Sequence, residues 1–500
     1  MGHRALQGIL PRILPLFFLY MRIFSWRSWE ILESGQKYLS LLFFREYFQK
    51  SRVLTSNQGK VNIMKLDSKT PHVIYTEVLE DEAINQFKNA LNQDSVVKAA
   101  LMPDAHTGYT LPIGGVVAVK DHIFPSYVGY DIGCGMCALK TPHTKEELMP
   151  HRDNIFNAIY RAIPTGEGRH NRVDEDWDFS HFHVTGKMKS IIKEHRALKQ
   201  LCSLGGGNHF IEISHDEEDN VWIVIHSGSR GIGYKTASHY MALAKLHADK
   251  ELVTVFNRDH RDRLIEEYNV KHKLFNEKNP DKYEAFLEAQ LQKELDSFIH
   301  KTVGKSVEGH YGLRTDSPEG ENYINDMNFC LEFALENRKR MIARVASEMN
   351  YYMRGDKLSD IDFAKEESDG HFINRNHNHA DLKDGLWIHR KGATHAEKGM
   401  LGVIPGNMRD GSFVVEGKGN EDSLCSSSHG AGRVMSRKKA YSTVSLEEFQ
   451  DSMSGITAKV TEKTKDESPF AYKNIFEVME LQKDLVEVKY YLKPLINIKG

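Results

Sequence analysis

Residues 128–136 read Val-Gly-Tyr-Asp-Ile-Gly-Cys-Gly-Met and place two potential metal ligands, Asp131 and Cys134, among three glycines. Glycine adopts backbone angles that other residues avoid, and it lets a ligand approach the main chain closely. Successive exposed N–H groups can also form concave sites for anions. The stretch therefore indicates a ligand-binding loop. Cys134-x-x-Cys137 also resembles a redox or half-zinc motif, but no second C-x-x-C and no thioredoxin-like context accompany it.

Seven further motifs of similar composition are spread along the chain. Most of them pair ligand-type or nucleophilic side chains with glycine or other small residues. One His beside a glycine is most often part of a turn or a satisfied core residue, so the motifs are informative only as a set. They occupy residues 102–108 with 112–115, 205–212, 226–231, 377–380, 389–394, 405–408 and 426–433. None of them matches the phosphate-binding loop G-x-x-x-x-G-K-S/T.

Five side chains in these motifs form a candidate set of metal ligands. Asp131 offers a carboxylate and Cys134 a thiolate, and three histidines, His209, His226 and His377, offer imidazoles. Thiolate and imidazole suit zinc, iron or manganese, and the carboxylate favours harder ions. The spacings are too long for a zinc finger. The five ligands would therefore have to converge from separate strands and loops.

The composition is that of an ordinary globular protein, with 40% hydrophobic and 27% charged residues and a net charge of −3. It excludes collagen-like and low-complexity chains, and five cysteines in 500 residues exclude a disulfide scaffold. A nearly neutral chain does not bind nucleic acid through bulk positive charge, so any nucleic-acid site must be local. The 25 histidines favour metal or acid–base chemistry.

The pattern of apolar residues predicts a mixed α/β fold from about residue 71 onward. We expect helices wherever apolar residues recur at helical spacing and strands at short apolar runs beside glycine-rich turns. The chain shows no internal repeat and no linker after Met64, which favours one catalytic domain. The expected helices are 77–91, 233–249, 280–301 and 324–349, the strands 116–119, 222–225 and 486–498, and a polar loop 304–320.

The first 63 residues need a separate interpretation. Residues 1–29 contain arginines but no acidic residue, and they include the apolar stretch 13–21. That stretch is too short to cross a bilayer, which takes about 20 residues, and no small-x-small cleavage site follows it. An Arg-rich, acid-poor leader suits organelle import. Alternatively, translation begins at Met64 and residues 1–63 are absent from the mature protein. We expect a cytoplasmic protein without a membrane segment, with organelle import as the alternative location.

Taken together and in this order, the motifs resemble those of the RtcB family of RNA ligases. The resemblance covers about residues 64–500 and is specific, because eight separate motifs agree. It implies a single large RtcB-type catalytic domain of mixed α/β (α+β) class, which is neither a Rossmann fold nor the nucleotidyltransferase fold of other ligases. It also implies GTP-dependent joining of RNA 3′-phosphate or 2′,3′-cyclic phosphate ends to 5′-hydroxyl ends.

The resemblance gives the metal ligands definite roles. In the family, the Asp and Cys of a D-x-x-C-G motif bind metal, and they fall on Asp131 and Cys134. The family's His ligands fall on His209, His226 and His377. Two Mn²⁺ ions bridged by the Cys134 thiolate are implied, and such a pair neutralises the charge of a transferred phosphate.

The family's nucleophile is the His of its H-G-A-G-R motif, which is His429 here. It attacks the α-phosphate of GTP to give a His–GMP phosphoramidate. The guanylyl group then passes to the RNA 3′-phosphate, and the 5′-hydroxyl displaces GMP. Covalent catalysis divides one difficult displacement into easier steps.

The resemblance also assigns the residues that contact GTP. Glu212 can accept two hydrogen bonds from the guanine N1–H and 2-amino edge, which adenine does not offer. The complete set is Asn208, Phe210, Ile211, Glu212, Asn378, Pro405, Gly406, Asn407, Met408, Ser412, Gly430, Ala431, Gly432, Tyr472 and Lys499.

For RNA, the candidates are basic residues beside the implied active site, because an arginine fork grips phosphate oxygens in two places. Arg230, Arg433 and Arg390 are the candidates, with Lys391 beside the last of these. Asp104 and His106 of the first motif are further candidates, either for supporting the residues that bind the ligands or for contact with the RNA end.

Two features depart from the family pattern. His379 stands where relatives often carry an aromatic or aliphatic residue, and we do not expect it to bind the metals. The region of about 273–320 is long and polar and is a candidate for partner or substrate specificity. Whether an activating protein partner is needed is left open by the sequence.

Two other functions remain as alternatives. A metal-dependent phosphoesterase acting on RNA ends could use the same ligands, but it needs no guanylylated histidine. An inactive RNA-binding paralogue is the third reading, and it has no reason to retain all five metal ligands.

Overall fold

The computed structural model describes residues 65–76, 78–303, 309–358 and 360–500. All of them belong to the unit Asn62–Gly500. The predictions for the leader-like first 63 residues lie outside the described part of the chain. Within that part, no helix is both long enough and apolar enough to cross a membrane.

The larger of two main sheets has eight strands, in the order β13-β14-β17-β6-β7-β5-β9, with β16 beside β17. Neighbouring strands run antiparallel, and only the short β16 pairs in parallel. The strands are β5 (Gly135–Thr144), β6 (Phe210–His215), β7 (Asn220–Ser227), β9 (Phe372–Asn376), β13 (Leu401–Pro405), β14 (Ser412–Gly417), β16 (Thr457–Ala458) and β17 (Val486–Lys499).

The second sheet has five strands in the order β1-β2-β3-β11-β10. Two small sheets, β12 with β15 and β4 with β8, complete the strand pairing among the described residues. The strands are β1 (His72–Ile74), β2 (Val96–His106), β3 (Ile113–Val119), β4 (His122–Ile123), β8 (Leu313–Arg314), β10 (Asn378–Lys383), β11 (Leu386–Lys391), β12 (Ala393–His395) and β15 (Ser426–Ser428).

The longest helix, α13, shows how the sequence sets helix boundaries. Ser317 caps its N-terminus by accepting a hydrogen bond from Gly320 N, and Pro318 occupies the first turn, where its missing N–H costs nothing. At the other end Gly355 adopts a left-handed conformation with φ 89°, which ends a helix readily because glycine has no Cβ.

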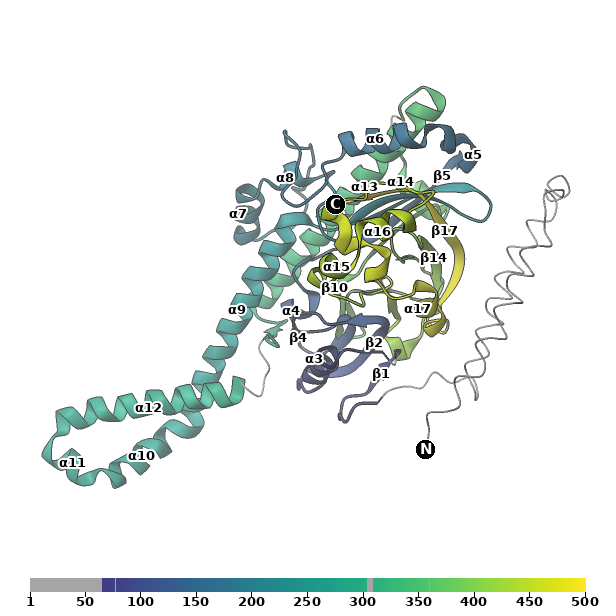
Figure 1. The fold of residues 1–500 in the computed structure, drawn as a ribbon. Helices are drawn as coiled ribbons and strands as arrows, with labels where there is room; N and C mark the ends of the chain where they lie inside the picture. The colour runs from purple at the N-terminus through teal and green to yellow at the C-terminus, as the bar shows by residue number, and fades with distance from the viewer. Residues whose placement is uncertain (1–64, 77, 304–308, 359) are drawn as a thin grey trace, which may run out of the picture. The chain divides into compact units, whose positions relative to one another are not determined.

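The α-helices in the described residues lie between and around these strands (Figure 1). They are α3 (Asp81–Leu91), α4 (Pro125–Val128), α5 (Lys145–Leu148), α6 (Arg152–Ala162), α7 (Gly186–Glu194), α8 (Ala197–Gln200), α9 (Arg230–Phe256), α10 (Asp262–Lys271), α11 (Lys273–Lys278), α12 (Pro280–Val303), α13 (Pro318–Arg354), α14 (Phe363–Ser368), α15 (Arg437–Thr443), α16 (Leu446–Ser452) and α17 (Ile475–Leu481).

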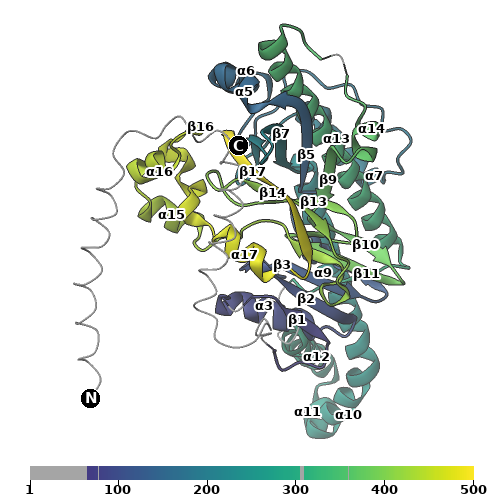
Figure 2. The ribbon, with the colours of Figure 1, turned by 90° about the vertical axis from the view of Figure 1, so that its right-hand side faces the viewer.

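The two sheets and their helices form layers, which Figure 2 shows edge-on. Helices α6 and α13 cover one face of the larger sheet through an apolar cluster that includes Ile159, Ile225 and Met341. A second cluster, with Val116 and Phe413, fills the space between the two sheets. Helix α3 covers the outer face of the five-stranded sheet.

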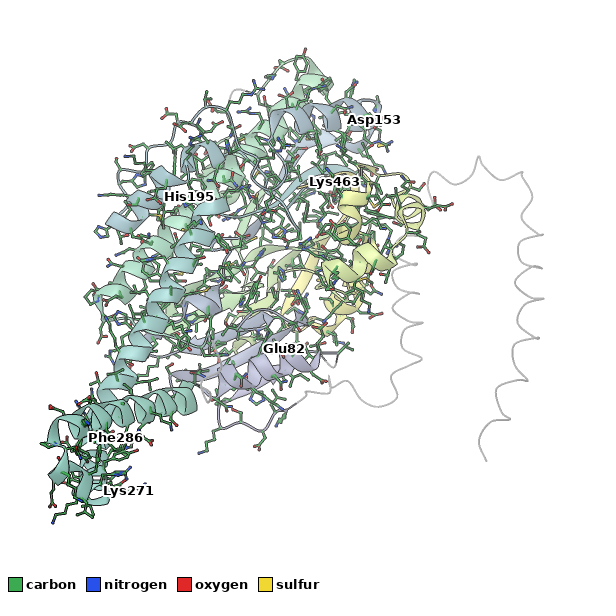
Figure 3. All side chains as sticks on the ribbon, turned by 60° about the vertical axis from the view of Figure 1, so that its left-hand side comes forward. Glu82, Asp153, His195, Lys271, Phe286 and Lys463 are labelled. Carbon is green, nitrogen blue, oxygen red and sulfur yellow. The ribbon has the colours of Figure 1, made fainter. Side chains whose placement is uncertain are left out.

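The predicted mixed α/β class is confirmed, and the mainly antiparallel pairing excludes a Rossmann fold, which is built on parallel strands. The expected helices and strands all occur, with shifted ends. The described residues of the polar region 273–320 are mostly helical, and residues 304–308 of the predicted polar loop lie outside the described part of the chain. A π-helical turn, Asn257–Arg261, follows α9, and helices α10, α11 and α12 then form an arm (Figure 3, where Lys271 and Phe286 lie near its end).

Candidate functional site

Strand pairing in the larger sheet explains why the predicted ligands converge. Gly135 at the start of β5 pairs with Ser227 of β7 on one side and with Asn376 of β9 on the other. The residue before each of Gly135 and Ser227, and the one after Asn376, is a predicted ligand: Cys134, His226 and His377. On the far side of β7, Phe210 pairs with His226, which brings the preceding His209 alongside.

The potential ligand atoms lie at distances suited to one metal centre. Cys134 Sγ is 3.3 Å from His209 Nε2 and 3.2 Å from His226 Nε2. His226 Nε2 is 3.3 Å from His377 Nε2, and Asp131 Oδ2 is 3.1 Å from His209 Nε2. The structure therefore brings together all five side chains that the sequence suggested as ligands. We refer to them as the central ligand group.

Main-chain carbonyls orient two of the imidazoles. His209 Nδ1 donates to Leu204 O at 3.0 Å, and His226 Nδ1 donates to Asn208 O at 3.2 Å. Because Nδ1 of each ring is committed to the main chain, Nε2 is the nitrogen that faces the other ligands. Outer hydrogen bonds of this kind are what hold metal-binding histidines in place.

The electrostatics of the central ligand group favour binding of a cation. Burial lowers the pKa values of His226 and His377 well below the usual value, so both rings are neutral. Burial and the Asp131 carboxylate raise the pKa of the Cys134 thiol. A metal ion reverses this effect by binding the thiolate directly. Burial opposes ionisation of Asp131, but contacts with His209 outweigh it and lower the pKa of this carboxyl.

Cys137 is not part of this group. It lies in β5 and is completely buried in the apolar cluster beneath α6 and α13. Burial raises the pKa of its thiol to about 12. Cys134 and Cys137 therefore do not act as a pair. Cys134 lies in the central ligand group, and Cys137 lies in the apolar core.

His429 follows β15 and lies beside the central ligand group, with its ring centroid 4.7 Å from that of His377. Its Nδ1 donates to Asp104 Oδ2 at 2.7 Å, and the N–H groups of His429 and Gly430 contact the same oxygen. Nδ1 therefore holds the proton and leaves Nε2 with a lone pair. Gly432 closes this turn with φ 74°, where a Cβ would collide with the Asp104 main chain.

Asp104 is fully buried in β2 of the five-stranded sheet. Burial works against its ionisation, but the attraction of His429, His106 and Lys473 prevails and lowers the pKa of Asp104. The carboxylate is enclosed and holds His429, so of the two roles expected for Asp104 the supporting role fits this placement and contact with RNA does not. A buried carboxylate that fixes the tautomer of a reactive histidine is a recurrent catalytic arrangement.

One cavity, of about 400 Å³, opens in front of His429. Most residues predicted to contact GTP line it, and we call it the nucleotide cavity. Its lining includes His226 of the central ligand group and His106, a predicted RNA contact. The predicted GTP contacts on its wall are Asn208, Phe210, Glu212, Pro405, Gly406, Asn407, Met408, Gly430, Ala431, Gly432, Tyr472 and Lys499.

The floor of the nucleotide cavity carries a buried carboxylate, Glu212. Its oxygens accept hydrogen bonds from Ser214 at 2.7 Å, Ser412 at 3.2 Å and Asn497 at 3.0 Å. Burial raises the pKa of Glu212 to about 7 despite these donors. At the cavity wall Lys499 Nζ pairs with Glu467 at 2.9 Å.

Three of the predicted GTP contacts do not line this cavity. Ile211 points away from it into the apolar core, because side chains alternate along β6. Ser412 lies behind Glu212 as its hydrogen-bond donor. Asn378 uses both ends of its amide within the protein: it donates to Asp131 O at 3.1 Å and accepts from Gly392 N at 2.9 Å.

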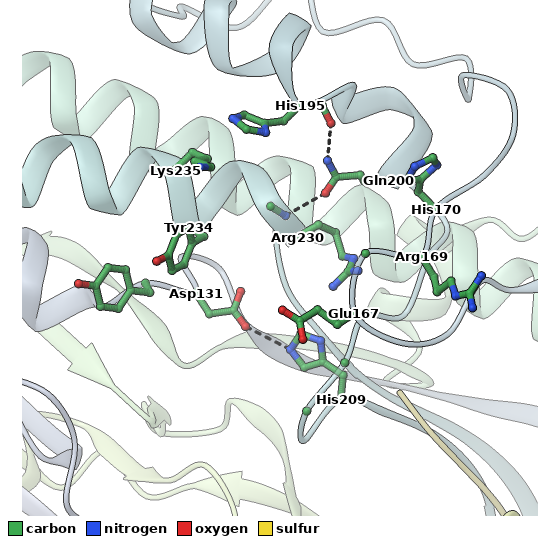
Figure 4. Close-up of a pocket in the computed structure, with 15 residues that line it drawn as sticks. Asp131, Glu167, Arg169, His170, His195, Gln200, His209, Arg230, Tyr234 and Lys235 are labelled. Atoms are coloured by element: carbon green, nitrogen blue, oxygen red, sulfur yellow. Dashed lines mark hydrogen bonds and ion pairs between the residues drawn. The ribbon is translucent and has the colours of Figure 1, made fainter. Parts of the chain in front are cut away.

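A second cavity, of about 630 Å³, lies on the other side of the central ligand group (Figure 4). Asp131 and His209 line it, and Arg230, Arg169 and Lys235 supply positive charge. We call it the basic cavity. The central ligand group thus contributes to the walls of both cavities.

Two predicted RNA contacts are placed differently from the expectation. The Arg390 guanidinium is fully buried and bound to Asp381 and to Ser426 Oγ. Lys391 is also buried, donates to Ser126 O at 3.1 Å, and has its pKa lowered to about 7 by burial. Both are therefore unavailable to RNA. Arg230 lies in the basic cavity, and Arg433 lies in the nucleotide cavity, where it contacts Glu467 and Tyr472.

The structure also adds residues that the sequence did not suggest. Tyr109, Arg437 and Asn497 line the nucleotide cavity, and Glu167, His170, His195 and Tyr234 line the basic cavity. Of these, only Asn497 carried a usable signal, since it lies two positions before Lys499 on the same strand and therefore shares its side of the sheet.

Two cavities whose walls share a set of thiolate, imidazole and carboxylate side chains, of which Cys134, His209 and His226 are buried, fit a metal-dependent enzyme. A family model described as tRNA-splicing ligase RtcB matches residues 86–500, and the chain belongs to this family of RNA ligases. The RNA-splicing ligase RtcB of Escherichia coli K12 is 33% identical over 442 residues, covering 84% of this chain and 95% of that protein.

Similar relatives occur in an archaeon and a eukaryote. The tRNA-splicing ligase RtcB of Methanococcus maripaludis is 28% identical over 497 residues, covering 85% of this chain and 92% of its own. The RNA-splicing ligase RtcB homolog 1 of Entamoeba dispar is 26% identical over 489 residues, covering 83% and 82% respectively. Family membership supports RNA ligation as the reaction class and RNA as the substrate class.

Proposed function

We propose that this chain is a GTP- and Mn²⁺-dependent RNA ligase that joins 3′-phosphate or 2′,3′-cyclic phosphate ends to 5′-hydroxyl ends through a His429–GMP intermediate. The observation that carries the proposal is the position of His429 between a buried orienting carboxylate, Asp104, and the central ligand group. A hydrolase would need only the ligands and a water molecule.

The donor set fits the implied ions. The central ligand group offers one thiolate, one carboxylate and three imidazoles, with the Nε2 lone pairs of His209 and His226 facing Cys134 Sγ. Asp131, Cys134, His209, His226 and His377 would hold the manganese. Bound Mn²⁺ would supply positive charge that offsets the charge of the reacting phosphate.

In the first step His429 Nε2 attacks the α-phosphorus of GTP. A nitrogen–phosphorus bond forms, the bond from that phosphorus to the bridging oxygen breaks, and pyrophosphate leaves. Asp104 keeps the Nδ1 proton in place and stabilises the positive charge that develops on the ring. The nucleotide cavity holds the guanine, with Glu212 as the acceptor for its N1–H and 2-amino groups.

In the later steps an RNA 3′-phosphate oxygen attacks the guanylyl phosphorus and displaces His429. The 5′-hydroxyl oxygen then attacks the 3′-phosphorus, and GMP leaves. The basic cavity suits the RNA ends, because Arg230, Arg169 and Lys235 can bind phosphate while the ends meet at the central ligand group.

The choice of RNA ends tests this function directly. The full chain with GTP and Mn²⁺ is expected to join a 3′-phosphate RNA to a 5′-hydroxyl RNA, and to leave a 3′-hydroxyl and 5′-phosphate pair unjoined. Labelled 3′-phosphate should appear in the new internal linkage on a denaturing gel. Release of inorganic phosphate without ligation, independent of GTP, would identify a phosphoesterase instead.

The raised pKa of Glu212, about 7, predicts a pH dependence of GTP binding. Only the ionised carboxylate accepts both guanine hydrogen bonds, and a raised pKa means that the protonated form dominates below pH 7. Affinity for GTP should therefore fall about tenfold per pH unit below 7 and level off above it. Calorimetric titration between pH 5.5 and 8.5 measures this.

The matched variant for that titration is Glu212→Gln, which keeps the shape of the side chain but cannot ionise. Its GTP affinity is expected to be weaker at pH 8 and nearly constant with pH. A steep profile that persists in Glu212→Gln would assign the titration to another group and remove the role proposed for Glu212.

A further inference from the structure

A second cluster of metal-ligating side chains lies apart from the central ligand group. It consists of His379 and Asp381 on β10 and His395 at the end of β12, and their three ligand atoms lie within 4.8 Å of one another. His379 Nε2 is 2.8 Å from His395 Nε2 and 3.5 Å from Asp381 Oδ1, and His395 Nε2 is 4.0 Å from the same oxygen. We call it the peripheral cluster.

The orientation of His395 favours metal binding. Its Nδ1 lies 3.0 and 3.1 Å from the two oxygens of Glu397. A carboxylate only accepts hydrogen bonds, so Nδ1 is the donor to Glu397 and Nε2 is the nitrogen that faces His379. A carboxylate that holds the far nitrogen of a metal-bound histidine is the usual outer partner in zinc sites.

Arg390 holds the other side of the cluster. Its buried guanidinium contacts Asp381 and lies 3.7 Å from Glu397. Asp381 and Glu397 thus both face this guanidinium, and Glu397 also interacts with Arg375. Arg390 is thus an orienting group for Asp381, whose oxygen has a second lone pair for a metal.

The separations suit a tetrahedral ion. Ligand atoms bonded to zinc at about 2.0–2.1 Å lie about 3.3 Å apart in that geometry. The three separations in the peripheral cluster, 2.8, 3.5 and 4.0 Å, lie on both sides of this value, whereas those in the central ligand group lie between 3.1 and 3.3 Å. Asp381 and His395 are partly exposed, whereas His379 is buried. An ion can therefore enter from solvent and be held against an enclosed imidazole.

We propose that His379, Asp381 and His395 form a second metal site that binds one Zn²⁺ ion, with water as the fourth ligand. Two imidazoles and one carboxylate with an open position suit zinc. The site is separate from the implied manganese centre, and the inference does not rest on the proposed ligase activity.

The position of the site gives it a structural role. His379 is two residues from His377, and β12 pairs with β15 so that His395 lies opposite Ser426. His429 follows β15 directly. An ion shared by β10 and β12 therefore fixes the strand that carries a central ligand relative to the strand that leads to the nucleophile.

Zinc content of the purified chain tests the site. In a Cys134→Ala/His226→Ala background, which disables the central ligand group, the chelator-treated chain is incubated with Zn²⁺, gel-filtered and analysed for metal. We expect about one Zn²⁺ per chain. Adding His379→Gln or His395→Gln should reduce this to near zero, and Glu397→Gln should weaken zinc affinity by about 10–100-fold.

His371→Gln is the matched control, because exposed His371 also pairs with a carboxylate, Glu366, at 3.1 Å but belongs to neither ligand cluster. It should retain zinc fully. If the background variant fails to fold, the same comparison in the wild-type chain should show a loss of one equivalent. Equal zinc content with and without His379→Gln would overturn the site and leave a plain hydrogen-bonded His–His pair.

Discussion

Replacing His429 with alanine is expected to abolish covalent labelling of the chain by α-labelled GTP. The wild-type chain with Mn²⁺ should carry the label through denaturing electrophoresis, because the phosphoramidate bond to Nε2 is covalent. Among the described residues, the other imidazoles that line the nucleotide cavity have main-chain partners at Nδ1: His106 contacts Asp104 O, and His226 contacts Asn208 O and faces Cys134 with Nε2. Label should therefore drop below detection in His429→Ala.

Asp104→Asn is the companion variant for this experiment. It keeps His429 and the size of the side chain but loses the carboxylate that fixes the Nδ1 proton. By comparison with other buried carboxylates that orient a reactive histidine, the labelling rate should fall by about 10²–10⁴-fold. Label that persists in His429→Ala would contradict the proposed nucleophile, whatever Asp104→Asn does.

The second large effect is expected from replacing the two cysteines of the C-x-x-C spacing. The loss of labelling by GTP should be large for Cys134→Ala and small for Cys137→Ala. Cys134→Ala removes the sulfur that contacts both His209 and His226, so labelling by GTP and Mn²⁺ retention should both fall by at least about 100-fold. Cys137→Ala removes only a buried sulfur from an apolar cluster. It should cost about 1–2 kcal/mol of stability and leave labelling largely intact.

Metal analysis and thermal unfolding of the two variants separate these effects. Cys134→Ala should lose metal, and Cys137→Ala should keep it while unfolding at a lower temperature. Equal loss of labelling and of metal in both variants would mean that the two cysteines act as one unit. That result would contradict their placement in different surroundings, with Cys134 in the central ligand group and Cys137 in the apolar core.

The sequence predicted which residues form the site better than it predicted the strand order and register that bring them together. Cys134, His226 and His377 were identifiable because metal ligands belong to few residue types and because the motifs resemble a known family. Their convergence depends on antiparallel register between strands more than 90 residues apart in the chain, which local spacing does not encode. The fold class followed from short apolar runs and helical periodicity, but the sheet order did not.

The corrections share one physical cause, which is pairing across strands. Arg390 looked like a phosphate contact because it stands beside a predicted active-site motif. Its position is set by Asp381, on the neighbouring strand β10, and by Glu397, which follows β12; both carboxylates face it in the interior. Asp104 is another case, since its partner His429 lies 325 positions away. Whether a charged side chain is exposed or buried therefore depends on partners that are distant in the sequence.

The central ligand group also acts on the folding equilibrium. Contacts between its members join residues 75, 92 and 151 positions apart, so an ion bound there behaves as a crosslink that closes three long loops at once. Loop closure of this kind restricts the unfolded chain most when the loops are long. By mass action, each tenfold rise in free ion above the dissociation constant adds about 1.4 kcal/mol to the free energy of unfolding. If the group binds an ion as proposed, the concentration of free metal therefore changes the stability of the fold as well as its activity.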